Sequence, residues 1–206
     1  MSTAPDGHAL VGSVVRLDVM RSDDGPALFA ALDDPRVWAA GYAGGPGARP
    51  GDLAGMQQFV ESARTDYQVG QRVPYVVRLA SASALGPAGT VVGTTSLGDV
   101  DLANERAHPG WTAYGARWWG RSVNPECKLL LLSHAFDDCG LGRVKIQTDA
   151  INTRSQAAIA RLGATREGLL RRHVRRADGT FRDTVVFSVV REDWPVIRAG
   201  LQARLA

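Results

Sequence analysis

One stretch of the sequence combines residue types that can bind phosphate. Between Trp111 and Glu126 an apolar strand pattern passes through a short loop, which holds Arg117, Gly120 and Arg121, into the start of a helix. The first N–H groups of a helix lack partners within it and carry partial positive charge, so they attract anions. Gly120 lets the backbone approach a ligand closely, and the two arginines flank it. These residues predict a diphosphate site.

The helix after this loop has clear start and stop signals. Asn124 is a favoured N-cap residue, Pro125 suits the first helical position, and Glu126 places an acid in the first turn. Gly140 supplies the stop, so we expect a helix over 124–139. The loop lacks the glycine, lysine and serine/threonine order of a nucleotide-hydrolase loop, and it also lacks a three-glycine dinucleotide fingerprint.

The remaining elements are expected in an order typical of an α+β, or mixed α/β, fold. Three successive strands in the middle of the chain suggest an antiparallel meander. We expect strands over 14–19, 75–79, 90–98, 111–116, 143–148 and 184–190, and helices over 27–32, 52–69, 124–139, 152–162 and from Trp194, with Asp193 as its cap.

The length and composition favour one globular domain. The chain has 206 residues, of which 45% are hydrophobic and 22% charged, enough for a single sizeable core. No uncharged apolar run approaches the roughly 20 residues of a membrane span. Residues 1–12 lack the features of a secretory signal, and we expect them to form a flexible tail before a domain over 13–206.

Only two cysteines occur, Cys127 and Cys139. A disulfide scaffold is therefore implausible, and we interpret both as reduced thiols of a cytoplasmic protein. Neither has another cysteine or a histidine at a spacing of two to four residues, so zinc is not expected and no metal site is assigned.

Taken as Arg117-x-x-Gly120-x-Ser122, the loop resembles the Arg/Gln-x-x-Gly-x-Gly/Ala signature of the GNAT superfamily of acetyl-CoA-dependent N-acetyltransferases. Ser122 departs from the signature, but its small side chain fits unless the backbone needs positive φ. Further motifs resemble the RimJ/RimL-type branch over roughly residues 14 to 195. They are Trp118-Trp119-Gly120-x-Ser122-Val123-Asn124, Val144-x-Ile146-x-Thr148-Asp149-Ala150-x-Asn152-x-Arg154-Ser155, Ile159-x-Arg161-Leu162-Gly163-Ala164-x-x-Glu167-Gly168 and Arg182-Asp183-Thr184.

The resemblance implies a mostly antiparallel central sheet flanked by helices and splayed between its fourth strand, 111–116, and its fifth, 143–148. The pantetheine arm of acetyl-CoA would lie in the splay, and backbone N–H groups of 119–123 would hold the diphosphate. Backbone groups near Trp118 would pair with the pantetheine amides. The residues expected to bind acetyl-CoA are Arg117, Trp118, Trp119, Gly120, Arg121, Ser122, Val123, Asn124, Asn152 and Ser155.

Asn152 and Ser155 match the Asn-x-x-Ser of this branch. The resemblance implies that Asn152 contacts the pantetheine and that Ser155 has a catalytic role, as a hydrogen-bond partner of the cofactor sulfur. Helix capping is the alternative for both residues, because Asn is a favoured N-cap and Ser155 lies three residues further on.

Transfer of acetyl to an amine requires the ammonium to lose a proton. Related proteins enter the fourth strand with Glu-Ile-Gly before Trp, whereas this chain has His108-Pro109-Gly110-Trp111. The resemblance therefore places His108 at the glutamate position, and its ordinary pKa of about 6.5 suits a general base. The alternative is a solvent-exposed loop histidine.

Other acids are alternative bases, acting directly or through water: Asp66, Asp99, Asp101 and Glu105. His134 lies in mid-helix among apolar residues and is expected to be structural. Tyr114 is either a proton donor or part of a strand face.

Several aromatic residues fall in the early helical region that closes over the acceptor site in this superfamily. They are Trp38, Tyr42 and Tyr67, which would wall an amine cleft or simply pack. The glycine-rich loop 41–51 is a candidate mobile lid.

The basic residues include a conspicuous bias. The net charge is +3, and all but Lys128 and Lys145 of the 24 basic residues are arginine. The bias reflects either codon composition or binding of phosphate and carboxylate. The arginine-rich run 171–176 precedes the hairpin-turn signal Asp178-Gly179, so we expect solvated hairpin arms. Contact with an acidic acceptor or the cofactor's ribose phosphate is an alternative, and nucleic acid is a weaker one.

The resemblance thus implies an acyltransferase that moves an acetyl group from acetyl-CoA directly to a primary amine in a ternary complex. A protein N-terminal α-amino group is the expected acceptor, and a small-molecule amine is the alternative. The absence of the usual glutamate also suggests a third hypothesis, a non-catalytic acyl-CoA-binding regulatory module. The helix from Trp194 packs on the domain or on a partner copy, which leaves a homodimer open.

Overall fold

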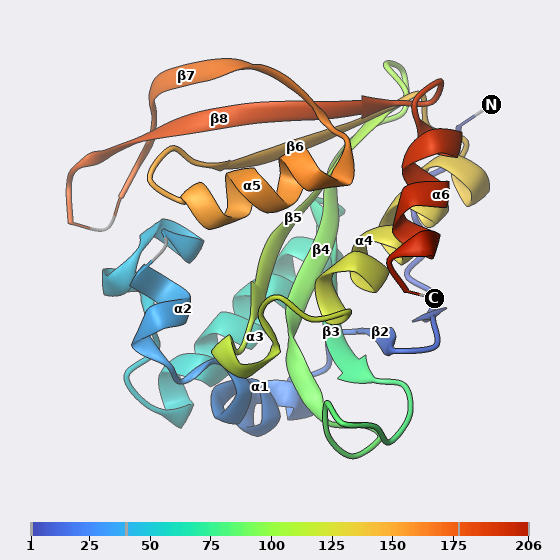
Figure 1. Cartoon of the computed structure of the whole chain (residues 1–206). Coiled ribbons are helices and arrows are strands. Elements are labelled where there is room, and N and C mark those ends of the chain that lie inside the picture. The colour runs from blue at the N-terminus through green and yellow to red at the C-terminus, as the bar shows by residue number, and fades with distance from the viewer. Residues whose placement is uncertain (1, 40, 177, 206) are drawn as a thin grey trace.

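The computed structural model describes residues 2–39, 41–176 and 178–205. Its centre is one twisted eight-stranded sheet, mostly antiparallel, in the order β1-β2-β3-β4-β5-β6-β8-β7 (Figure 1). The expected mixed α/β fold is confirmed. The strands are β1 Leu10–Val11, β2 Val15–Val19, β3 Arg72–Leu79, β4 Val91–Asp101, β5 Arg106–Tyr114, β6 Arg143–Asp149, β7 Thr165–Arg175 and β8 Phe181–Val190.

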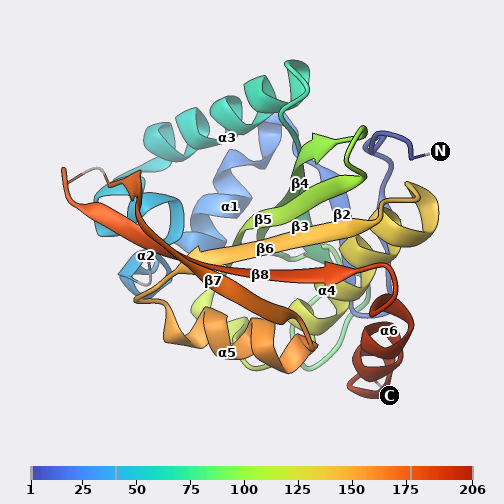
Figure 2. The same ribbon diagram turned by 90° about the horizontal axis from the view of Figure 1, so that it is seen from above.

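Helices cover both faces of the sheet. Helices α1 and α3 lie on one face, and α4, α5 and α6 lie on the other (Figure 2). Strands covered on both sides bury nearly every side chain, as β3 does, where Tyr75 and Val77 pack toward one core cluster and Val76 toward the other. The helices are α1 Gly25–Leu32, α2 Pro35–Ala39, α3 Leu53–Gln68, α4 Val123–Ser133, α5 Thr153–Leu162 and α6 Trp194–Ala203.

The N-terminal segment differs from the expected flexible tail. Residues Leu10–Val11 form β1, which pairs with β2, and Leu10 is buried in the core. The N–H of Thr3 donates to the carbonyl of Cys139 at 2.9 Å. The buried Glu126 carboxylate accepts hydrogen bonds from three successive N–H groups, those of residues 13–15. Hydrogen bonds to residues more than 110 positions further along the chain thus hold this segment in place.

Helix α4 starts earlier than its sequence signals indicate, but it ends where they place its end. It begins at Val123, so Ser122 and not Asn124 occupies the N-cap position. The helix continues past Ser133 as one wider turn of π-helix over His134–Asp138. Gly140 then ends it with a left-handed backbone, φ 65°, as expected. The proline therefore sits in the first turn, where its missing N–H costs nothing.

The C-terminal helix α6 packs on the domain. Ile197 and Leu201 are buried, and the indole of Trp194 stacks on Phe136 with ring centroids 5.5 Å apart. Of the two sequence alternatives for this helix, packing within the chain is therefore the one observed. Within the described ranges, no helix combines the length and apolarity needed to cross a membrane.

Candidate active site

The sheet opens between β5 and β6. These neighbouring parallel strands pair only at Arg106 with Arg143 and at Ala107 with Val144. Beyond these residues they diverge, and Figure 1 shows β4 and β5 turning away from β6, β7 and β8. The expected splay between these two strands is confirmed. Because strand pairing normally satisfies the backbone groups of a sheet, a split of this kind presents N–H and C=O groups to a ligand.

His108 lies at the point where the strands separate. It belongs to β5, because the strand begins at Arg106 and not at Trp111 as expected. Its side chain is only 4% exposed, so the solvent-exposed alternative is wrong. The Nδ1 atom lies 2.8 Å from the carbonyl oxygen of Lys145 on β6. A carbonyl only accepts, so Nδ1 carries the proton and Nε2 presents a lone pair.

Burial changes the acid–base chemistry of His108. Removal from water disfavours the imidazolium and lowers the pKa of His108 to about 4, although the hydrogen bond to Lys145 partly opposes this. The ring is therefore neutral at pH 7. Its Nε2 is able to accept a hydrogen bond, but it holds a proton less strongly than the ordinary histidine assumed from the sequence.

This lowered pKa predicts a pH-dependent stability. An unfolded histidine titrates near 6.5, so from about pH 6.5 down to about pH 4 the unfolded chain binds a proton that the native His108 does not. The free energy of unfolding therefore falls across this window as the pH falls, by about 3 kcal/mol from this group. Denaturant unfolding of the wild type and of His108→Gln from pH 7.5 to 4.5 measures it. Equal pH slopes in the two proteins would contradict the assignment.

A β-bulge follows His108 on the same strand. The register with β4 shifts between Gly110 and Ala113, and Trp111 has φ 48°, a conformation that a tryptophan seldom adopts. The Tyr42 hydroxyl donates to the Trp111 carbonyl at 3.3 Å, and the Arg72 guanidinium lies 4.9 Å from the Trp111 ring centre. Such strained positions gather at functional sites. Apart from the glycine at 110, no sequence pattern indicates the bulge.

The expected diphosphate loop lies between β5 and α4. Gly120 has a left-handed backbone, φ 72°, and a Cβ there would meet nothing within 4 Å. The loop therefore offers open space at its glycine, next to the free N–H groups of the α4 N-terminus. Arg117 and Arg121 are exposed beside it, and the Arg121 Nε donates to the Arg117 carbonyl at 3.2 Å. This arrangement fits an anionic diphosphate.

The two tryptophans of the loop have structural contacts. Trp118 is buried in the core and its Nε1 donates to the Leu85 carbonyl at 3.1 Å. The Nε1 of Trp119 donates to the Tyr114 carbonyl at 2.8 Å. These bonds hold the loop backbone in place, and the main-chain N–H of Trp118 also donates within the loop, to the Gly115 carbonyl at 3.0 Å.

The start of α5 lies against this loop. The guanidinium of Arg154 sits 3.4 Å from the ring centre of Trp119, a close cation–π contact. The Asn152 Oδ1 accepts from the N–H of Ser155 at 2.9 Å, so Asn152 is the N-cap of α5. The capping role of Asn152 is thus present in the structure. Two helix N-termini, those of α4 and α5, follow the two strands that separate, at the same end of the split.

Capping and ligand contact by Asn152 are separable by substitution. Serine also caps helices, whereas alanine does not. We expect Asn152→Ala to lower the free energy of unfolding by about 1 kcal/mol and Asn152→Ser to leave it nearly unchanged. If the amide also contacts the pantetheine, both variants raise the KM for acetyl-CoA. Urea unfolding and initial rates measure the two effects, and an unchanged KM in the serine variant would leave capping as the only role.

A groove of about 450 Å³ lies on the face of β6, β7 and β8 that bears Lys145. Lys145 connects it to the split, because its carbonyl binds His108 and its Nζ lies 3.1 Å from the Asp99 carboxylate. The groove is lined by Asp99, Lys145, Gln147, Glu167, Gly168, Leu170, His173 and Val186.

The other candidate bases are engaged in structural contacts. Asp101 accepts from the N–H and side chain of Asn104 in the β4–β5 turn, and these hydrogen bonds lower the pKa of its carboxyl. Glu105 accepts from the Ser2 hydroxyl in the same turn. Asp66 pairs with Arg72 at 2.8 Å. Asp99 also has a partner, the Lys145 Nζ, but it lines the groove beside the split, so its position and that of His108 favour these two residues over the other three.

The aromatic residues expected at the acceptor cleft lie in three different parts of the structure. Trp38 is fully buried in the core, and Tyr67 lies beside Gly7 of the N-terminal segment. Only Tyr42 reaches the bulge. Tyr114 is also buried, and its hydroxyl has no partner among the described residues; burial raises the pKa of Tyr114. A core position of this kind agrees with the strand-face interpretation of Tyr114.

One ion pair near the site had no sequence signal. Asp149, at the end of β6, is almost fully buried and pairs with Arg176 at 2.5 Å. A Cβ on Gly41 would lie 2.8 Å from the Asp149 Oδ2, so loop 41–51 covers this carboxylate. Arg171, Arg172 and Arg175 are exposed on β7, as expected for solvated hairpin arms, but Arg176 is not.

Comparison with known proteins agrees with this geometry. The profile of the acetyltransferase (GNAT) domain matches residues 15–165. YdaF of Bacillus subtilis, which carries the name of a ribosomal N-acetyltransferase, is 29% identical over 107 residues, which cover 52% of this chain and 57% of that protein. The chain therefore spans little more than half of this curated relative.

Solved structures match over the whole chain. A GCN5-related N-acetyltransferase from Brucella melitensis is 26% identical with a TM-score of 0.87, covering 100% of this chain and 88% of its own. A protein from T. thermophilus described as an acetyltransferase is 31% identical with a TM-score of 0.82, and the match covers both chains completely. These matches confirm the resemblance to GNAT acetyltransferases seen in the sequence, and the chain belongs to the GNAT family of acetyltransferases.

Proposed function

We propose that this protein transfers an acetyl group from acetyl-CoA directly to a primary amine. The observation that carries the proposal is the split between β5 and β6, which leaves strand backbone groups unpaired beside a helix N-terminus. Loop residues 119–123 would hold the diphosphate. Backbone N–H groups of β5 near the bulge at Trp111 would polarise the thioester carbonyl, the usual role of oriented donors in acyl transfer.

The acceptor amine would enter from the groove next to Lys145. The groove holds two carboxylates, those of Asp99 and Glu167, which are paired with Lys145 and Arg143, so an entering ammonium group would share them with these cations. The amine attacks the thioester carbonyl carbon as its proton leaves through water hydrogen-bonded to His108 Nε2. The C–S bond breaks, and the departing sulfur takes a hydrogen bond from the Ser155 hydroxyl. Holding both substrates in one complex supplies much of the rate.

A protein N-terminal α-amino group is the acceptor that we favour, because the groove is lined in part by β7, an edge strand whose residues are mostly exposed, and because the curated relative bears a ribosomal name. A small amine is the second candidate, since a volume of about 450 Å³ is also that of a small-molecule site. Both cysteines are free and buried, which suits a reducing cytoplasm. A homodimer is compatible with this proposal but is not required by it.

Acceptor profiling tests the proposed reaction. The full chain is incubated with acetyl-CoA and either peptides with free N-termini or polyamines and aminoglycosides, and released thiol is measured. Mass spectrometry then locates the acetyl group. We expect turnover with peptides and modification of the α-amine. Turnover with small amines alone would favour the second candidate, and tight acetyl-CoA binding without turnover on any amine would favour the regulatory module.

Ser155 is expected to affect chemistry more than binding. Its hydroxyl lies in the first turn of α5, next to Arg154 and the Trp119 contact. Ser155→Ala should lower kcat by about tenfold, the size of one hydrogen bond to a developing charge, with little change in the KM for acetyl-CoA. Steady-state kinetics measures the two constants. A raised KM with unchanged kcat would assign Ser155 to binding.

A further inference from the structure

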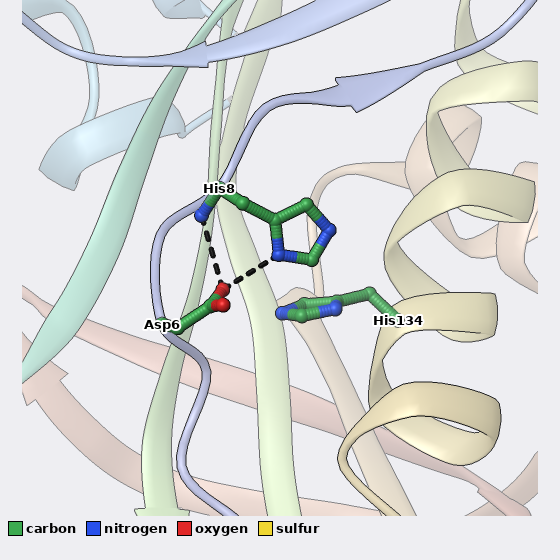
Figure 3. Close-up of side chains that lie close together, drawn as sticks. All are labelled: Asp6, His8 and His134. Atoms are coloured by element: carbon green, nitrogen blue, oxygen red, sulfur yellow. Dashed lines mark hydrogen bonds and ion pairs between the residues drawn. The ribbon is translucent and has the colours of Figure 1, made fainter.

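Three potential metal ligands meet outside the set of residues assigned to acetyl transfer. Asp6 and His8 come from the N-terminal segment, and His134 comes from the π-helical turn that ends α4. Their side chains point toward one another in Figure 3. One ligand atom from each lies within 4.8 Å of the other two, and the Asp6 Oδ1 is 2.6 Å from the His8 Nδ1. Imidazole and carboxylate groups are common zinc ligands.

A fourth donor and a supporting carboxylate surround His134. Its Nδ1 lies 3.0 Å from the Asp138 carboxylate, so Nδ1 carries the proton and Nε2 keeps its lone pair. That Nε2 is 3.7 Å from the buried Cys139 thiol. A histidine whose second nitrogen donates to a carboxylate is the usual support of a metal-bound imidazole. The contact between His134 and Asp138 is thus a second observation, separate from the convergence of Asp6, His8 and His134.

Backbone hydrogen bonds hold the N-terminal segment, which carries Asp6 and His8, against the end of α4, which carries His134. The Thr3 N–H donates to the Cys139 carbonyl, and β1 pairs with β2 just after His8. The His134 side chain is nearly fully buried, whereas His8 and Asp6 are about half and two-thirds exposed. Asp6, His8 and His134 therefore sit in place with access from solvent, as a site for an exchangeable ion requires, whereas the buried Cys139 would have to turn toward the ion.

We propose that Asp6, His8, His134 and Cys139 bind a zinc ion. Two nitrogen, one oxygen and one sulfur ligand suit tetrahedral Zn²⁺. Ligand atoms at about 2.0–2.3 Å from zinc lie roughly 3.3–3.7 Å apart, so the Asp6–His8 contact opens by roughly 1 Å. The Cys139 thiol loses its proton to solvent on binding. The ion thereby joins the N-terminal segment to the end of α4.

The spacing of these residues explains why the sequence predicts no metal. Cys139 and His134 are five residues apart, and the other two ligands lie more than 120 residues away. Motif spacing of two to four residues detects only local ligand pairs. The π-helical turn and β1, neither of which had a sequence signal, bring Asp6, His8 and His134 together, and Cys139 lies next to His134.

Zinc titration of the full chain tests the site. The protein is purified without a histidine tag, stripped with a chelator and titrated with Zn²⁺ alone, and bound metal is counted by elemental analysis. We expect one zinc per chain. His8→Gln should weaken binding at least 100-fold without unfolding the protein, because this side chain is half exposed. Asp138→Asn should weaken it 10- to 100-fold. The matched control is His173→Gln, which lies on β7 and should bind zinc like the wild type.

The cobalt-substituted protein tests the sulfur ligand. Co²⁺ accepts the same donors as zinc and absorbs visibly when tetrahedral. A thiolate-to-cobalt band in the wild type that disappears in Cys139→Ser supports the full ligand set. Stripped wild type that takes up no zinc, or His8→Gln that binds as tightly as the wild type, would overturn the proposal, and a missing thiolate band would remove Cys139 from it.

Discussion

Replacing His108 by glutamine is expected to lower kcat about 100-fold, with little effect on the KM for acetyl-CoA. General bases contribute about 10²- to 10⁴-fold. The pKa of about 4 places His108 at the lower end, because a weakly basic nitrogen guides the proton to water without retaining it. The acidic limb of the kcat/KM profile should accordingly not reflect an ordinary histidine near pH 6.5. Initial rates from pH 5 to 9 measure both quantities.

Asp101→Asn is the control for His108. Asp101 is a candidate base by sequence, but it is bound in the β4–β5 turn by Asn104. This variant should keep kcat within about twofold of the wild type, since surface changes of this kind alter little. Unchanged turnover in His108→Gln would remove His108 from the mechanism and direct attention to Asp99, which faces the groove.

Placing alanine at Gly120 should weaken acetyl-CoA binding by about 10- to 100-fold. The left-handed backbone at this position, φ 72°, costs a residue with a Cβ roughly 1–2 kcal/mol. The added methyl group also projects from the loop that would surround the diphosphate. The first effect lowers stability, and the second lowers affinity. Calorimetric titration with acetyl-CoA gives the affinity, and thermal unfolding gives the stability.

Gly179→Ala separates backbone strain from the loss of ligand contact. Gly179 has φ 85° in the β7–β8 turn, and a Cβ there also meets nothing within 4 Å. Its substitution should destabilise the fold by a similar amount and leave acetyl-CoA affinity unchanged. If Gly120→Ala binds acetyl-CoA as tightly as Gly179→Ala does, the diphosphate does not lie in this loop.

The sequence was sufficient to predict those parts of the fold that local signals determine. Asp52 caps α3 and accepts from the Gly55 N–H, and Gly163 ends α5 with a left-handed backbone, close to where the pattern places these boundaries. The start of α4 was less well predicted. Three good local signals at 124–126 compete there with the burial of Glu126 against residues 13–15, and that long-range contact has no trace in the local sequence.

The residues of the candidate site also fall into two groups, those that local sequence signals predicted and those whose roles depend on long-range contacts. Gly120 and Asn152 were found because each has a local conformational role, a left-handed backbone and a helix cap. The burial of His108 depends on strand β6, some 37 residues further on, and so does its lowered pKa. The pairing of Asp149 with Arg176 likewise depends on a contact between the end of β6 and the β7–β8 hairpin, 27 residues further on.

The crystal structure of the full chain with acetyl-CoA is the most direct test of the central claim, that the split between β5 and β6 is the catalytic site. We expect the diphosphate oxygens to accept hydrogen bonds from the N–H groups of 119–123 and the thioester to lie against the bulge at Trp111. His108 Nε2 should be within one water molecule of the amine position. A diphosphate bound outside this loop, or a thioester outside the split, would contradict the account.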